Sequence, residues 1–113
     1  MRLETVLLLA HTLKESMIVE YDLKGKAILA TSNFEAVKMS TLNAAYEAGT
    51  VDGKNADARK IQEAQVLATS GPYAEAKHAM MEAERAAALA GIECRAVEAQ
   101  ISLTKAWLMS QGN

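Results

Sequence analysis

The stretch PYAEAKHAMMEAERAAALAGIECRAVEAQISLTKAWLMS, residues 72–110, decides the fold. Steps that alternate three and four residues along it meet an apolar side chain at every position except Thr104. This is the heptad spacing of a helix that packs lengthwise against another helix. We therefore predict one long helix over about 72–110. Its packing or oligomer seam consists of Tyr73, Ala76, Met80, Ala83, Ala87, Ala90, Cys94, Val97, Ile101 and Leu108, with Thr104 as the polar member.

A second apolar series runs along the same helix from about residue 89 onward. At about 100° per residue, this series lies roughly opposite the seam. A helix that is apolar on two opposing sides needs partners on both, so its C-terminal half should lie inside a bundle of three or more helices. Because one short chain offers few helices, we expect a homodimer first and a tetramer second. The second apolar face comprises Leu89, Ile92, Ala96, Ala99 and Leu103.

The first segment of the chain also has helical spacing, from about residue 3 to about residue 48. A glycine inside a helix costs about 1 kcal/mol relative to alanine, and Thr, Ser and Asn favour caps and turns. Gly25 and the TSN of residues 31–33 are therefore its weakest points, and a single helix kinked near 25–33 and two separate helices both stay open. The apolar series that begins this segment is Leu3, Val6, Ala10, Leu13, Met17 and Tyr21.

Helix-breaking residues lie between the two long segments, at 49–55 and again in the TSGPY of 69–73. Between them we expect a short helix over about 56–68, with Asn55 as its N-cap. Proline fits the first turn of the helix that follows. The sequence thus predicts one all-α domain over residues 1–113. It is a long helical hairpin with a short connecting helix, which forms a helical bundle by homo-oligomerisation.

Composition and charge argue against several classes of protein. The net charge of −2 creates no overall field toward nucleic acid or an acidic membrane. The single cysteine, Cys94, cannot form an internal disulfide and fits a reducing compartment. The apolar run VLLLA, residues 6–10, is far shorter than the roughly 20 residues of a membrane span, and Glu4 and His11 interrupt a secretory signal pattern. We expect a cytoplasmic protein without a membrane partner.

The stretch AGTVDGKN, residues 48–55, nearly matches a phosphate-binding loop. Such a loop follows a buried strand and ends in a hydroxyl residue, whereas here a predicted helix precedes it and Asn55 takes the last position. A turn between two helices is the better interpretation. A weaker anion site is still predicted, because cations gather where a helix exposes its first N–H groups. Its residues are Lys54, Asn55, Arg59 and Lys60.

The sequence contains no pattern typical of a catalytic, metal or cofactor site. Neither His11 nor His78 has a second His, Cys or Asp at ligand spacing on its own helix, and Glu75 and Glu82 beside His78 are more typical of a surface pair network than of a metal site. Few aromatic side chains are present to stack on bases, and basic residues of the first segment cluster only locally, at Lys24, Lys26 and Lys38. We predict a protein that is not an enzyme, that binds no metal or cofactor, and that has at most weak affinity for nucleic acid.

Residues 50–91, TVDGKNADARKIQEAQVLATSGPYAEAKHAMMEAERAAALAG, resemble small Ala/Glu-rich helical proteins of bacteriophages and prophages, whose function is unknown. The resemblance implies an accessory role beside phage replication and recombination functions, in the cytoplasm of a bacterial host. We therefore expect a non-enzymatic binding or scaffold protein, an accessory factor for DNA replication or recombination. The alternative is an inhibitor that sequesters a host protein or a nucleotide-type signalling ligand through the basic helix N-terminus. The matching positions are Gly53, Asn55, Arg59, Gln62, Tyr73 and Glu84.

Overall fold

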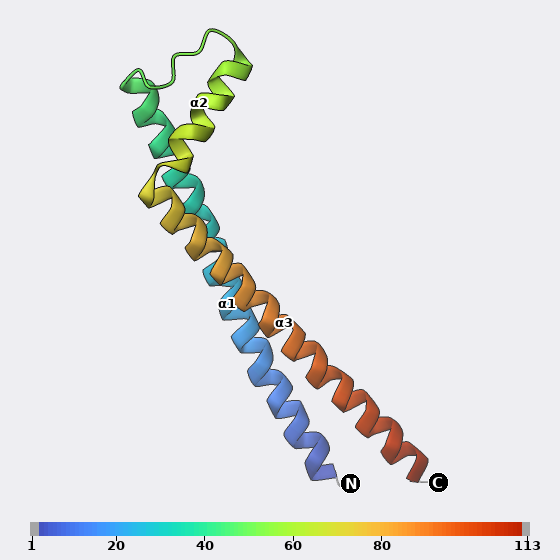
Figure 1. Cartoon of the computed structure of the whole chain (residues 1–113). Coiled ribbons are helices and arrows are strands. Elements are labelled where there is room, and N and C mark those ends of the chain that lie inside the picture. The colour runs from blue at the N-terminus through green and yellow to red at the C-terminus, as the bar shows by residue number, and fades with distance from the viewer. Residues whose placement is uncertain (1–2, 112–113) are drawn as a thin grey trace. The chain divides into compact units, whose positions relative to one another are not determined.

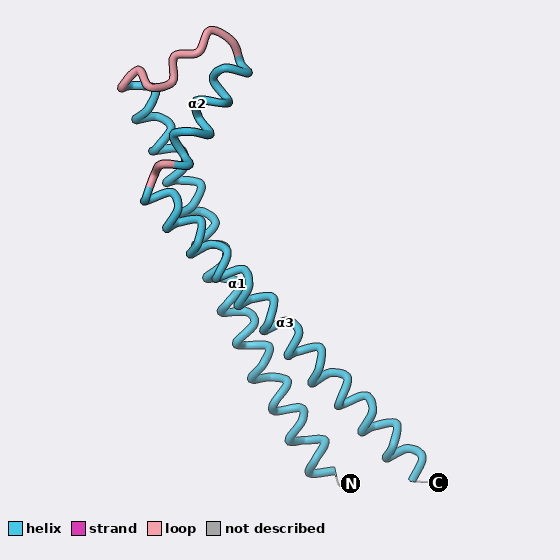
Figure 2. The backbone as a smooth tube through the Cα atoms, viewed as in Figure 1, coloured by secondary structure: helices cyan, strands magenta, loops and turns pink. Residues whose placement is uncertain are grey.

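A computed structural model describes residues 3–111, and it places them in three α-helices and two connections (Figures 1 and 2). Helix α1 spans Leu3–Glu47, α2 spans Ala56–Ala68 and α3 spans Gly71–Gln111. No strand occurs anywhere within residues 3–111. The all-α class predicted from the sequence is therefore confirmed.

Helix α1 is a single helix of 45 residues that continues through Gly25 and through residues 31–33. A Cβ atom added to Gly25 would meet nothing within 4 Å, so the glycine serves no close approach to a neighbour. Its local cost of about 1 kcal/mol is offset by packing, because half-buried positions keep three- and four-residue spacing on both sides of it. These positions include Val6, Leu9, Leu13, Ser16, Glu20 and Leu23 before the glycine and Ala27, Ala30, Phe34 and Val37 after it.

The inward stripe of α1 differs from the apolar series that the sequence suggested. Of that series only Val6 and Leu13 are half-buried. The other four residues, Leu3, Ala10, Met17 and Tyr21, are exposed on the flank of the helix. The helix instead turns inward a stripe that includes two polar residues, Ser16 and Glu20. The apolar series indicates a helix but does not say which side of it faces inward, because α1 is apolar over more than one stripe.

The chain divides into two compact units. The first unit joins the described residues up to Lys26 with those from Glu84 onward. Within it the N-terminal part of α1 and the C-terminal part of α3 lie side by side and run in opposite directions, as the arms of a helical hairpin do (Figure 1). Its most buried side chains are those of Ala87, Cys94, Val97 and Thr104, all on α3.

The second unit comprises Ala27–Ala83, which is the rest of α1, all of α2 and the first turns of α3. The rings of Phe34 and Tyr73 pack at 5.2 Å between centroids, with an interplanar angle of 39°. Tyr46 on α1 donates its hydroxyl to Glu63 on α2 over 3.1 Å. Partial burial and the neighbouring Glu63 carboxylate raise the pKa of that hydroxyl. This unit buries Ala45, Val51 and Ala76.

Three helix ends in the second unit have caps that follow from their sequence. Gly49 adopts a φ of +76°, and the N–H of Thr50 returns to the carbonyl of Ala45 at 2.9 Å, which closes α1 as a glycine-based C-cap does. Asn55 caps α2, as predicted, by accepting the N–H of Ala58 at 2.8 Å. Ser70 caps α3 by accepting the N–H of Tyr73 at 3.2 Å.

Candidate functional site

The loop before α2 is built around the side chain of Gln62, which lies in the second turn of that helix. Its carboxamide oxygen accepts the backbone N–H groups of Asp52 at 3.0 Å and Gly53 at 2.7 Å. Its amide nitrogen donates to the Asp52 carboxylate at 2.7 Å. One side chain therefore satisfies three polar groups of the loop. Sequence reasoning gave Gln62 a place only in the phage resemblance, and its loop contacts were missed.

The hydrogen bonds of this loop already engage the backbone N–H groups that an anion would need. Asn55 fills the start of α2 with its own side-chain oxygen, and Arg59 donates from Nη1 to the carbonyl of Gly53 at 3.2 Å. Lys54 and Lys60 are exposed. The four residues predicted to bind an anion thus lie around one helix start, but two of them are engaged within the loop. Phosphate-binding loops present free N–H groups, and those of Asp52, Gly53 and Ala58 have partners.

The glycine at position 53 is needed for close packing in this loop. A Cβ atom there would lie 2.8 Å from the Cβ of Ala58 and 2.9 Å from the backbone nitrogen of Arg59. The second of these is backbone and cannot move aside cheaply. A tight turn packed onto α2 therefore explains the GKN of residues 53–55 without a ligand.

We expect Gln62→Ala to destabilise the loop and α2 by about 1–3 kcal/mol, because it leaves the N–H groups of Asp52 and Gly53 without their acceptor. Hydrogen exchange measured by NMR should show both amides exchanging faster. Gln65→Ala is the matched control, since Gln65 is an exposed glutamine on the same helix. Equal exchange rates in both variants would contradict the role given to Gln62.

The seam residues predicted on α3 all lie on its less exposed side. Ala76, Ala87, Cys94 and Val97 are buried, and so is Thr104. The remaining members, Tyr73, Met80, Ala83, Ala90, Ile101 and Leu108, are half-buried.

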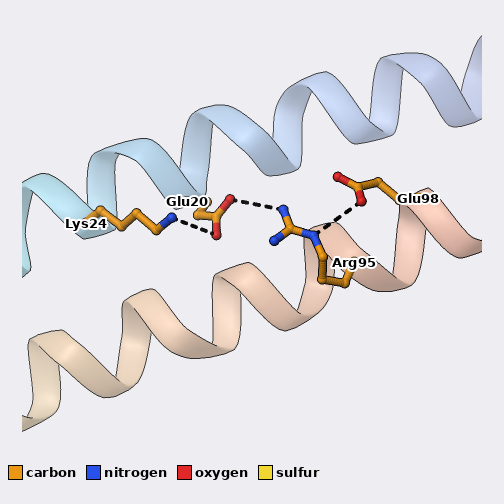
Figure 3. Close-up of polar contacts among 4 residues, drawn as sticks. All are labelled: Glu20, Lys24, Arg95 and Glu98. Atoms are coloured by element: carbon orange, nitrogen blue, oxygen red, sulfur yellow. Dashed lines mark ion pairs between the residues drawn. The ribbon is translucent and has the colours of Figure 1, made fainter.

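A charged cluster lies in the first unit, where α1 faces α3 (Figure 3). The carboxylate of Glu20 on α1 is 3.3 Å from Lys24 Nζ and 3.5 Å from Arg95 Nη2 on α3. Arg95 also pairs through Nε with Glu98 at 3.3 Å. The Glu20 side chain is only 12% exposed, whereas that of Arg95 is 60% exposed. Pairs with such exposed partners contribute roughly 0–1 kcal/mol each, so this cluster positions the helices more than it stabilises them.

Gly91 provides the space into which Glu20 turns. A Cβ atom at Gly91 would lie 2.7 Å from Glu20 Oε2. The thiol of Cys94 is buried beside the same carboxylate, and burial first, then the charge of Glu20 and a hydrogen bond to it, raise the pKa of the thiol. Sequence reasoning missed Glu20, because a carboxylate at the spacing of Leu13, Ser16 and Leu23 is expected in solvent unless the residues of the opposite helix are known.

The second apolar face of α3 is exposed along its whole length. Leu89, Ile92 and Leu103 are 58%, 65% and 72% exposed, and the two alanines between them, Ala96 and Ala99, are exposed as well. Trp107 continues this face toward the C-terminus.

The flank of α1 in the first unit is also apolar and exposed, and it is hollowed. A shallow groove of about 410 Å³ lies along it, lined by Ala10, Leu13, Lys14, Met17, Ile18 and Tyr21. A second groove, of about 290 Å³, opens where α1 meets α3 near His11 and Glu93. Exposed apolar side chains in such number are typical of a surface that binds another protein.

The described residues, 3–111, hold neither a metal-binding cluster nor a membrane-spanning helix. No group of three or more His, Cys, Asp or Glu side chains in that range is arranged to hold a metal ion. His11 lies 3.6 Å from Glu15, its neighbour one helical turn on, and His78 is exposed. No helix in the described part of the chain has both the length and the apolar character to cross a membrane.

Comparison with known proteins adds no relative. No protein-family model, no curated protein and no solved structure matches this chain.

Proposed function

We propose that this chain is a non-enzymatic helical scaffold protein that acts by binding other helices, beginning with copies of itself. The observation that supports this is the exposed apolar surface of the first unit. Leu89, Ile92 and Leu103 on α3 are 58%, 65% and 72% exposed, and Leu7, Leu8 and Tyr21 on α1 are 61%, 65% and 79% exposed. Exposed apolar side chains that gather in this way mark surfaces that bind other proteins.

Self-association is the simplest use of this surface, because a second copy offers the same apolar stripes at equal concentration. We place the protein in the cytoplasm, as its single buried thiol and its composition suggest. The first unit has few buried side chains, so association also completes its core.

Sedimentation equilibrium tests this function directly. We expect a mass of at least twice 12.1 kDa at micromolar concentration, with helix content that falls when the protein is diluted. A stable monomer that keeps its full helicity on dilution would overturn the proposal.

An accessory role in phage DNA replication or recombination is the biological setting that we propose for this scaffold. Its support is the resemblance of residues 50–91. Of the basic residues that the sequence offered for DNA, Lys24 is paired with Glu20 and Lys38 is half-buried. Direct contact with DNA is therefore weakly supported, and a role through proteins is the better form of the proposal. Gel shifts with single- and double-stranded DNA at low salt separate the two, since a salt-sensitive shift would require direct binding.

The alternative, an inhibitor that captures a nucleotide-type ligand at the start of α2, receives less support. Its expected donors are engaged by Gln62, Asn55 and the carbonyl of Gly53.

A further inference from the structure

Along the second apolar face of α3, the side chains are large at both ends and small in the middle. Large side chains, Leu89 and Ile92, stand at one end, and Leu103 and Trp107 stand at the other. Between them the face carries only Ala96 and Ala99. Two helices that cross at small residues approach closely there and diverge away from the crossing point. The large side chains at each end can then fill the widening gap.

This face is also free of charge between residues 88 and 107. At about 100° per residue, the charged residues of this stretch lie off the face. Glu93 and Arg95 border it on opposite sides, and Glu98 and Lys105 point toward the seam side. A surface of this kind matches an apolar helix, and it offers nothing that would select nucleic acid or an acidic peptide.

The charges at the two ends of the face favour one orientation of a partner helix, antiparallel to α3. Arg85 lies in line with the face, one turn before Leu89. The last turn of α3 carries no basic residue, so the negative end of its dipole has no cation of its own within the described chain. In a parallel pair the two Arg85 side chains would face each other. In an antiparallel pair centred between Ala96 and Ala99, each Arg85 reaches the C-terminal turn of the other helix.

We propose that a second copy of this chain covers the second apolar face, by antiparallel pairing of α3 with α3 about a two-fold axis between Ala96 and Ala99. Ala96 then lies against Ala99 of the second copy, and Ile92 lies against Leu103 of the second copy. The chemistry of the face agrees with this occupant, since a second copy presents the same uncharged apolar stripe, and its Arg85 meets a C-terminal turn that carries no basic residue. The inference rests on the proposed self-association and adds its surface and its direction.

Cysteine cross-linking of the full chain tests this geometry. In a Cys94→Ala background, one chain carries Ile92→Cys with isotope labelling and the other carries Leu103→Cys without it. Antiparallel pairing places these two cysteines opposite each other at the same height along the axis, which is the arrangement that a disulfide between the chains requires. Two copies of the same variant hold their cysteines about 16 Å apart along the axis, at 1.5 Å per residue. We expect at least about ten times more mixed than same-variant dimer under mild oxidation.

Lys105→Cys replaces Leu103→Cys in the matched control. Position 105 is exposed and only two residues away, but it points to the other side of α3, so no cross-link to Ile92→Cys is expected. Circular dichroism of each variant checks that the helices are intact.

The outcomes separate the inference from the function on which it rests. Same-variant dimers as the main product would show parallel pairing and overturn the proposed direction. No cross-link in a chain that still sediments as an oligomer would overturn the surface and leave self-association standing. A monomer in sedimentation would overturn both.

Discussion

Ala87→Glu will unfold the paired helices of the first unit. Ala87 is 8% exposed on the seam of α3. A carboxylate placed there loses its hydration without gaining a partner, which costs about 3–5 kcal/mol. Domains of this size are stable by only about 5–15 kcal/mol in total, so the loss should be visible as reduced helicity and a much lower thermal midpoint. Far-UV circular dichroism during heating measures both.

Ala79→Glu is the control for this substitution. It introduces the same side chain into the same helix at an exposed position, where substitutions usually change stability by less than about 0.5 kcal/mol. If Ala87→Glu kept the helicity and midpoint of the parent protein, the seam would not be where the burial of Ala87 places it.

The course of α3 could be predicted from the sequence because its seam is the stripe that stays apolar over the whole helix. The seam is apolar at every step but Thr104, and charged residues such as Glu82 and Arg85 stand off it. The second apolar side begins only near residue 89, so turning it inward would also bury Arg85. The buried residues Cys94 and Val97 lie on the predicted line for this reason.

The packing of α1 could not be predicted, because several of its stripes are comparably apolar. The stripe that faces inward includes Glu20, which hydropathy would place in solvent. Glu20 can lie there because of two residues on α3: Gly91 leaves space for its carboxylate, and Arg95 pairs with it. A single-sequence pattern holds no information about which residues of a distant helix will lie opposite.

The loop before α2 shows the same limit at short range. Its cap at Asn55 was predictable, because that preference depends on one residue and the helix that follows. The hydrogen bonds from Asp52 and Gly53 to Gln62 depend on the path of the turn, which the sequence does not specify. Asn55 and Arg59, which the sequence suggested as anion ligands, instead form hydrogen bonds within the loop.

Cys94 should be protected from alkylation by a large factor. Its side chain is fully buried, so iodoacetamide can reach the sulfur only when the first unit opens. An opening that costs about 4 kcal/mol slows the reaction about 1,000-fold relative to the unfolded chain, at about 1.4 kcal/mol per factor of ten. Mass spectrometry of samples quenched at intervals gives the rate in the native protein and in denaturant.

Lys105→Cys in a Cys94→Ala background is the control for accessibility, because Lys105 is exposed eleven residues further along the same helix. Its thiol should react within a small factor of the unfolded rate. Native Cys94 reacting as quickly as this control would show that the seam opens readily, and it would remove the basis for treating α1 and α3 as a stable pair.

The Cys94 thiol also makes the stability of the fold depend on pH, so that the protein becomes less stable at alkaline pH. Burial raises the pKa of Cys94 in the folded state, so above a pH of about 8.5 the unfolded chain loses its thiol proton while the folded chain keeps it. Deprotonation then favours the unfolded state, and the free energy of unfolding falls as the pH rises. The thermal midpoint should therefore fall more between neutral and alkaline pH in the parent protein than in Cys94→Ala. That variant retains every other titrating group. Equal drops in the two proteins would mean that the folded state does not hold this proton more tightly, and that the thiol beside Glu20 is open to water.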